Sequence, residues 1–436
     1  MAFIRSRLFG QWGRSRPPGR LDARADIAED EPDGIGGNVG ATNGKLPQER
    51  SESRRAAGAV FVLAAVVILA SVPFRPDHVE GDEGFANAGI RALTHFARGE
   101  FGHPYWREND SFYGSPSPRI GPMILGAHDL AARAIGFDAE NKRIVFLRVV
   151  YGLWSALGVA LMFMLARETA GSKTAAWLGA AASLANPVFR SVQVSILPET
   201  PMIPLAAAAL LFTHRVSRAA MRGGDTRLAS AIAGAFIGLA IGCKLYAIPL
   251  LVVFALTRIL DGDSSAGRRW RDITIASAVA AVVFAAFHPL LWTDPAFALR
   301  EMTTGHLRAL GGELGTLRSD SLAYVATMPF VGVAIHPWPL NQLGGLPLPS
   351  GFQLGVVAVC VALTAVGGYR AIRKGSWLLV TFATASFLWA GFVVATLTPG
   401  WIVPKVFLLP ALGLCALWGV ALGAIADRLF PRLRAL

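Results

Sequence analysis

Long apolar segments restrict this chain to one class of fold. About ten of them, rich in Ala, Leu, Val and Ile, cover most of the sequence from residue 57 onward. An α-helix needs about 20 mostly apolar residues to cross a bilayer, and it satisfies its own backbone hydrogen bonds there. The runs do not alternate in the way that a membrane β-barrel requires. The sequence therefore predicts an all-α polytopic membrane protein with about ten transmembrane helices.

The predicted spans are 57–74, 144–166, 174–190, 197–213, 228–243, 245–260, 272–292, 352–369, 376–396 and 401–425. Little more than Lys244 separates the fifth span from the sixth, so this pair forms either a tight helical hairpin or one span with a re-entrant piece. The composition agrees with a membrane protein, because 53% of the residues are hydrophobic and only 16% are charged.

Basic residues in the short connections predict how the chain is inserted, because cytoplasmic loops are enriched in Lys and Arg. They fall on the side of the N-terminal tail: Arg167, Lys173, Arg215, Arg218, Arg222, Arg227, Arg258, Arg268, Arg269, Arg271, Arg370, Arg373, Lys374, Arg428, Arg432 and Arg434. We expect a multi-pass protein of the cell (inner) membrane with both termini in the cytoplasm. The formal net charge of +12 then reflects topology. Nucleic acid is not an expected partner, because the Arg residues are scattered between apolar runs.

Three parts follow from this topology. Residues 1–56 mix charged residues with Gly and Pro, so we expect a disordered cytoplasmic tail. Residues 57–425 form the transmembrane domain, and residues 426–436 form a basic cytoplasmic tail. The long connections 75–143 and 293–351 face outward.

The first outer loop should contain helices that lie along the membrane surface. Apolar side chains recur there at helical spacing, opposite a basic side: Ala86, Ile90, Leu93 and Phe96 against Arg91, His95 and Arg98. A second helix of this kind is predicted from Arg119 to Ile135.

Two adjacent carboxylates, Asp82 and Glu83, follow the first apolar run, where the chain would emerge from lipid. There they would be hydrated enough to stay ionised, yet close to a lipid headgroup, so they could do acid/base chemistry on a lipid-borne substrate. They could equally cap the helix that follows, because acids at a helix N-terminus gain about 0.3–1 kcal/mol from the dipole.

Cysteine and histidine give no sign of a structural metal. Cys243, Cys360 and Cys415 fall in or beside apolar runs, and His103, His306 and His336 lack the close spacing of a zinc site. No strand-turn-helix phosphate loop is present in the sequence either, so a donor should arrive through the membrane rather than as a nucleotide sugar.

The order of several motifs resembles the GT-C polytopic glycosyltransferases, above all the dolichyl-phosphate-mannose protein mannosyltransferases and the lipid A aminoarabinose transferases. The motifs are Asp82-Glu83, Arg148 opening a span that ends in Leu165-Ala166-Arg167, Asn186-Pro187, Glu199, Gly238-Leu239-Ala240 followed by Lys244, His288-Pro289, Asp294-Pro295-Ala296-Phe297 and Val403-Pro404-Lys405. They extend over most of residues 57–425.

The resemblance implies that a hexosyl or pentosyl group moves, with inversion, from a polyprenyl-phosphate donor to a glycan, lipid or protein acceptor on the outer face. Asp82 is then the first candidate for the base, since desolvation near the bilayer strengthens a carboxylate as a base. Glu83 could share that role or orient the acceptor. Together with donor phosphate oxygens it could also hold a divalent cation as a cofactor.

Six further residues are candidates for substrate binding: Glu199, Lys244, Arg119, Arg148, His306 and Lys405. Glu199 could bind sugar hydroxyls or provide a second acid, or it could cap the helix that begins before Pro201. Lys244 could pair with the donor phosphate, or its ammonium group could extend to the membrane surface.

Two other classes of protein fit the same apolar pattern. A transporter or flippase for lipid-linked sugars would also be all-helical, although its intramembrane charges should lie midway along the spans. The other alternative is a noncatalytic subunit of an assembly machine for envelope glycans.

Overall fold

The computed structural model describes residues 45–72, 82–107, 120–193, 196–197, 199–261, 265–300, 302, 350–374, 376–396 and 408–430. It divides into the units Met1–Glu49 and Arg50–Leu436, and the second unit holds almost all of the described residues. These residues form helices and no strands. The predicted all-α architecture is therefore confirmed.

The helices coincide closely with the apolar runs. They are α2 (Lys45–Leu69), α3 (Asp82–Ala97), η2 (Pro104–Trp106), α4 (Ile120–Ala134), α5 (Glu140–Ala170), α6 (Lys173–Ala185), α7 (Pro187–Val192), α8 (Glu199–Met221), α9 (Arg227–Cys243), η3 (Leu245–Ala247), α10 (Pro249–Leu260), α11 (Ala266–Ala286), α12 (Leu290–Thr293), α13 (Pro295–Arg300), α17 (Ser350–Arg373), α18 (Leu378–Thr396) and α19 (Leu408–Leu429). Helix α2 begins at Lys45 rather than at Ala57. The predicted span 174–190 is interrupted at Asn186, whose side chain caps α7.

Two described helices, Asn141–Ala170 and Leu408–Leu429, are long and apolar enough by themselves to cross a membrane. Shorter apolar helices cover Arg227–Cys243, Leu245–Leu260 and Leu378–Ala390. The number of spans thus stays a prediction. Around Lys244, where the sequence predicts either a tight hairpin or one span with a re-entrant piece, α9 ends, Lys244 is extended and the short helix η3 precedes α10.

Small residues let the long helices approach closely, as is common between membrane helices. A Cβ atom added to Gly419 of α19 would lie 2.6 Å from the Cα of Gly179 in α6. One added to Gly234 of α9 would lie 2.3 Å from the carbonyl oxygen of Ala276 in α11. Helices α9 and α11 therefore pack backbone to backbone.

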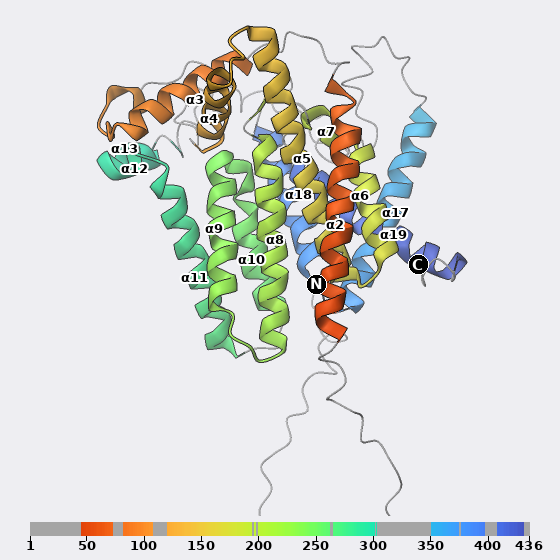
Figure 1. Ribbon diagram of the computed structural model, residues 1–436. Coiled ribbons are helices and arrows are strands. Elements are labelled where there is room, and N and C mark those ends of the chain that lie inside the picture. Colours follow the sequence, from red (N-terminus) through yellow and green to blue (C-terminus); the bar gives the residue numbers. More distant parts are fainter. Residues whose placement is uncertain are drawn as a thin grey trace, which may run out of the picture. The chain divides into compact units, whose positions relative to one another are not determined.

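Helices α3, α4, α12 and α13 lie together at one end of the long helices (Figure 1). We call this the Lys244 end, because α9 ends there at Lys244. Helices occur at both places where the sequence predicts surface helices in the first outer loop. Helices α3 and α4 cross at two glycines. A Cβ added to Gly89 of α3 would lie 2.0 Å from the carbonyl oxygen of Pro122 in α4, and one added to Gly126 of α4 would lie 2.4 Å from Gly89.

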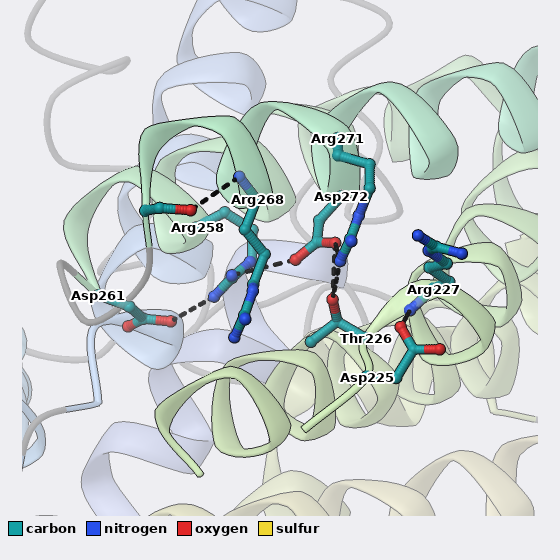
Figure 2. A network of polar contacts seen from close by, with 9 residues as sticks. Asp225, Thr226, Arg227, Arg258, Asp261, Arg268, Arg271 and Asp272 are labelled. Atoms are coloured by element: carbon teal, nitrogen blue, oxygen red, sulfur yellow. Dashed lines mark hydrogen bonds and ion pairs between the residues drawn. The ribbon is translucent and has the colours of Figure 1, made fainter. Parts of the chain in front are cut away.

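A buried network of charged groups ties α9, α10 and α11 together at the opposite end, the Arg258 end (Figure 2). Asp272 of α11, which is fully buried, accepts hydrogen bonds from Arg258 at 3.1 Å and from the hydroxyl of Thr226 at 2.7 Å. Arg271 donates to both Thr226 and Asp272, and Asp261 lies 3.8 Å from Arg258. Because Thr226 immediately precedes α9, the network fixes the start of the helix that carries Lys244 at its other end.

Replacing Asp272 with Asn should destabilise the protein strongly. The change removes the closer carboxylate from a guanidinium that is only 1% exposed, and breaking a buried ion pair on one side costs about 3–5 kcal/mol. The thermal stability of the detergent-solubilised protein would measure this loss. Asp225→Asn is the matched control, because Asp225 is exposed and accepts from the backbone of Arg227 and Thr226 rather than from a buried guanidinium. Equal stability of the two variants would contradict the assigned role of Asp272.

Candidate functional site

Glu199 and Lys244 form an ion pair at the Lys244 end. The Lys244 ammonium lies 3.5 Å from Oε1 of Glu199, and the two side chains are 14% and 0% exposed. Glu199 is the first residue of α8. Lys244 ends α9 in an extended conformation, with φ −155° and ψ 139°, so its side chain leaves the helical path. Two predicted candidates that are 45 positions apart in the sequence are therefore in contact.

The turn that presents Glu199 is held by hydrogen bonds from neighbouring elements. The Asn186 side chain accepts from the backbone of Val188 and Phe189, which starts α7. After α7, the hydroxyl of Thr200 donates to the carbonyl of Val192. These contacts join the end of α7 to the first turn of α8.

A cation in this setting is suited to binding an anion. The aromatic ring of Tyr246 lies 5.8 Å from the Lys244 ammonium. Because the surroundings are largely buried, charge interactions are screened less there than in water. A phosphate oxygen could share the ammonium with Glu199, whereas the ion pair alone could serve only to join α8 to α9.

Arg148 also lies at this end of the protein, on α5, and it is 3% exposed. Its neighbour Leu147 packs against Leu125 of α4 and Ile196, which precedes α8. Arg148 therefore belongs to the junction of α4, α5 and the turn before Glu199.

Helix α4 links this junction to α3. Ile120, its first residue, fills the space beside Gly242, where an added Cβ would lie 2.1 Å from the Ile120 side chain. Gly242 is two positions before Lys244, so the first turn of α4 lies against the end of α9. The candidate Arg119 directly precedes this turn but lies outside the described residues, as do His306 and Lys405.

Asp82 and Glu83 are the first two residues of α3, and their side chains lie outside the described part of the structure. Their position at a helix start suits a cap as well as a catalytic role. Residues 82, 89 and 96 share one face of α3, because seven residues make nearly two helical turns. Position 82 is thus on the face that meets α4 at Gly89.

A small hydrophobic core joins α3, η2 and α4 to α12 and α13. We call it the collar core; its buried members are Ala92, Tyr105, Trp106, Met123, Leu290 and Ala298. Arg107 forms an ion pair with Asp294 at 3.1 Å on its surface. The collar core therefore connects the first outer loop to the segment that follows α11.

A histidine cluster closes the connection from α3 to η2. His95 donates to Glu100 at 2.6 Å, and its ring stacks on that of His103 with the centroids 4.0 Å apart. The hydrogen bond from His95 holds the pKa of Glu100 below its ordinary value of 4.5, with the charges of His95, Arg98 and His103 adding to this effect. The ionised carboxylate is therefore the form that this connection favours.

The sequence did not point to several of these contacts. Nothing in it connects Tyr246 with Lys244, Arg107 with Asp294, or Thr226 with Asp272, because each pair joins elements that only the fold brings together. One signal was available, since Asp272 is an acid at the start of a predicted span, where an uncompensated charge would be costly. In the part of the chain that the structure describes, no group of three or more His, Cys, Asp and Glu side chains could hold a metal ion.

The described helices form an apolar bundle, with short helices at one end and the buried Glu199–Lys244 pair beneath them. This arrangement is that of a polytopic membrane protein. The family model described as dolichyl-phosphate-mannose-protein mannosyltransferase matches residues 134–292, from the end of α4 to α12. This stretch contains Arg148, Glu199 and Lys244. Among curated protein sequences, none matches the chain significantly.

Two solved structures share the fold. ArnT from Cupriavidus metallidurans, bound to undecaprenyl phosphate, is 20% identical with a TM-score of 0.55; the match covers 86% of this chain and 60% of that chain. The archaeal oligosaccharyltransferase AglB from Archaeoglobus fulgidus, in complex with an inhibitory peptide and a dolichol-phosphate, is 15% identical with a TM-score of 0.53; the shares are 88% and 52%. These matches confirm the predicted resemblance to the GT-C polytopic glycosyltransferases, and this chain spans only part of their length.

Acid should loosen the connection between α3 and η2. A carboxyl group whose pKa is lowered by folding stabilises the folded state above its ordinary pKa, and this contribution is lost as the pH falls through the lowered value. The protection of the amides of residues 95–106 against hydrogen exchange, measured relative to the intrinsic exchange rate at each pH, should therefore fall as the pH is lowered below the ordinary pKa of Glu100, which is 4.5. Glu100→Gln should remove this pH-dependent step, while Glu52→Gln, at an exposed position of α2, should retain it. An unchanged step in Glu100→Gln would exclude the His95 contact as its cause.

Proposed function

We propose that this protein is a membrane glycosyltransferase that uses a polyprenyl-phosphate-linked sugar donor. The observation that carries the proposal is the match of residues 134–292 to the mannosyltransferase family model, because this stretch forms α5 to α12 and contains the buried Glu199–Lys244 pair. Two fold relatives bound to undecaprenyl phosphate and to a dolichol-phosphate support a lipid-linked donor.

The transfer requires one bond to form and one to break. An acceptor hydroxyl or amine attacks the anomeric carbon of the sugar from the side opposite the phosphate, so the configuration inverts. The bond between this carbon and the phosphate oxygen breaks, and the polyprenyl phosphate leaves with the bonding electrons. The acceptor proton goes to a base, for which we propose Asp82, with Glu83 sharing the role or orienting the acceptor.

The leaving phosphate gains negative charge, so cations should surround it. We assign this role to Lys244, with Arg148 and Arg119 beside it and with His306 and Lys405 as further contacts. Glu199 would keep the Lys244 ammonium in place before the donor binds, or it would bind sugar hydroxyls. A divalent cation held by Glu83 and phosphate oxygens would add to the same stabilisation.

The reaction would take place on the outer face of the cell membrane, because the basic connections assign both termini to the cytoplasm. The acceptor can be a glycan, a lipid or a protein. Mass spectrometry of envelope lipids and glycans from cells with and without this protein would identify the transferred sugar and the acceptor.

The enzyme is distinguished from a flippase and from a noncatalytic subunit by Asp82→Asn. We expect this variant to insert normally and to lose transfer, because the base is neutralised while the shape is kept. Unaltered transfer would exclude Asp82 as the base. Normal lipid-linked sugar translocation by the wild type without any transfer would favour the flippase.

Lys244→Ala should weaken the binding of undecaprenyl phosphate to the protein in lipid nanodiscs about 10- to 100-fold, because a charged hydrogen bond contributes about 1.5–3 kcal/mol. Native mass spectrometry can measure this affinity. Lys142→Ala is the control, since Lys142 is exposed in the first turn of α5, near the same end.

Lys244→Ala also removes an ammonium group from beside the buried Glu199 carboxylate, which would weaken the folded state. The double variant Lys244→Ala with Glu199→Gln removes both charges, so it should fold well and still bind weakly. Wild-type affinity in the double variant would show that the pair joins α8 to α9 without contacting the phosphate.

A further inference from the structure

We propose that α3 acts as a lever, so that contacts at its C-terminal end set the position of Asp82 and Glu83 at its N-terminal end. The proposal rests on the function proposed above for these two residues. It assigns Phe96 and its aromatic neighbours as positioning residues, which act on the reaction through α3 without touching the substrate.

The fulcrum is the crossing of α3 and α4. Gly89 and Gly126 meet there with backbone against backbone, because an added Cβ on either residue would lie within 2.9 Å of three backbone atoms of the other helix. Helix α4 is itself anchored below, where Ile120 packs beside Gly242 of α9. Helices α3 and α4 also meet in the collar core, through Ala92 and Met123, but at the two glycines their backbones are in contact, so the helix axis would tilt about this point.

The C-terminal arm of α3 ends in an aromatic joint. The Phe96 ring stacks on Phe287 at the end of α11, with the centroids 6.0 Å apart, and lies 6.2 Å from Trp292 of α12. Phe101 meets Trp292 edge to face at 4.8 Å. Trp292 is fixed in turn, because its indole nitrogen donates to the carbonyl of Ala285 at 2.7 Å.

An ion pair restrains the same arm on the other side of η2. Arg107 and Asp294 lie 3.1 Å apart, with side chains 61% and 33% exposed. A pair this exposed contributes little stability, roughly 0–1 kcal/mol. The Arg107–Asp294 ion pair sets the orientation of the aromatic joint, while the stacked rings of Phe96 and Phe287 keep its two sides in contact.

The two arms of the lever are equal. Position 82 and Phe96 are each seven residues from Gly89, which is about 10 Å along the helix axis. A tilt that moves Phe96 by about 1 Å therefore moves the start of α3 by about 1 Å in the opposite direction. A catalytic group misplaced by 1 Å can cost about 100-fold in rate, so the joint is a sensitive control on a base at position 82.

Truncation of the joint tests the lever, with Phe96→Ala as the main variant and Phe96→Tyr as the conservative one that keeps the ring. Spin labels at Ala86 on the N-terminal arm and Leu157 on α5 report the position of α3 by pulsed electron resonance. Phe137→Ala is the matched control, because Phe137 pairs with Phe146 at 5.6 Å between α4 and α5 and takes no part in the joint.

We expect Phe96→Ala to shift or broaden the distance between the labels and to lower kcat about 10- to 100-fold. Measured without divalent cations, its affinity for undecaprenyl phosphate should stay within about twofold of the wild type, because the lever moves Glu83 but not Lys244 or Arg148. Phe96→Tyr and Phe137→Ala should leave both the distance and kcat unchanged.

The lever is overturned if Phe96→Ala lowers kcat without changing the distance, or changes the distance without lowering kcat. It is also overturned if Phe137→Ala has the same effects as Phe96→Ala, since the joint would then have no special role. A failure of the function proposed above gives a different result: the wild type transfers no sugar, or Asp82→Asn keeps full transfer, while the distance still responds to Phe96→Ala.

Discussion

Charge that is removed from water must be compensated, and this constraint organises both ends of the helix bundle. Asp272 and Arg258 are almost fully buried, and each is placed beside an opposite charge that comes from another helix. Glu199 and Lys244 show the same arrangement at the opposite end. In an apolar bundle such pairs add little net stability compared with apolar residues, but a helix that shifts along its neighbour separates them at great cost. They therefore fix how α8, α9, α10 and α11 align.

The rest of the packing allows this alignment but does not specify it as strongly. Helices α6 and α19, like α9 and α11, meet through Gly and Ala, so their contacts are close and nearly featureless. Small residues repeat along these faces, and a displaced helix would find similar contacts. Each ion pair can form in only one alignment of its two helices. The ion pairs therefore select one register among several that packing alone would permit.

The helices could be predicted from the sequence because each apolar run is local and long enough to indicate a helix by itself. The interruption at Asn186 could not, because it depends on a side chain that caps α7 and competes with continuation of the helix. Lys244 and Glu199 were recognised one by one, as polar residues at the ends of apolar runs. Their contact was not predicted, since it arises from the packing of α8 against α9 and from the extended backbone of Lys244. The collar core depends on contacts between the first outer loop and the segment after α11, which no local pattern reveals.

The backbone contact between α9 and α11 has a consequence for how disturbances travel through the protein. At Gly234 and Gly238 the backbone of α9 lies against Ala276 and Ala280 of α11, with the Val283 side chain beside Gly238, so little side-chain material separates the two helices there to absorb a displacement. Helices α9 and α11 should therefore move together as one rigid unit. The charged network around Asp272 holds this unit at the Arg258 end, and Lys244 and the aromatic ring of Phe287 lie at its other end. A displacement at the Arg258 end would therefore be carried along both helices to Lys244 and Phe287 at the other end.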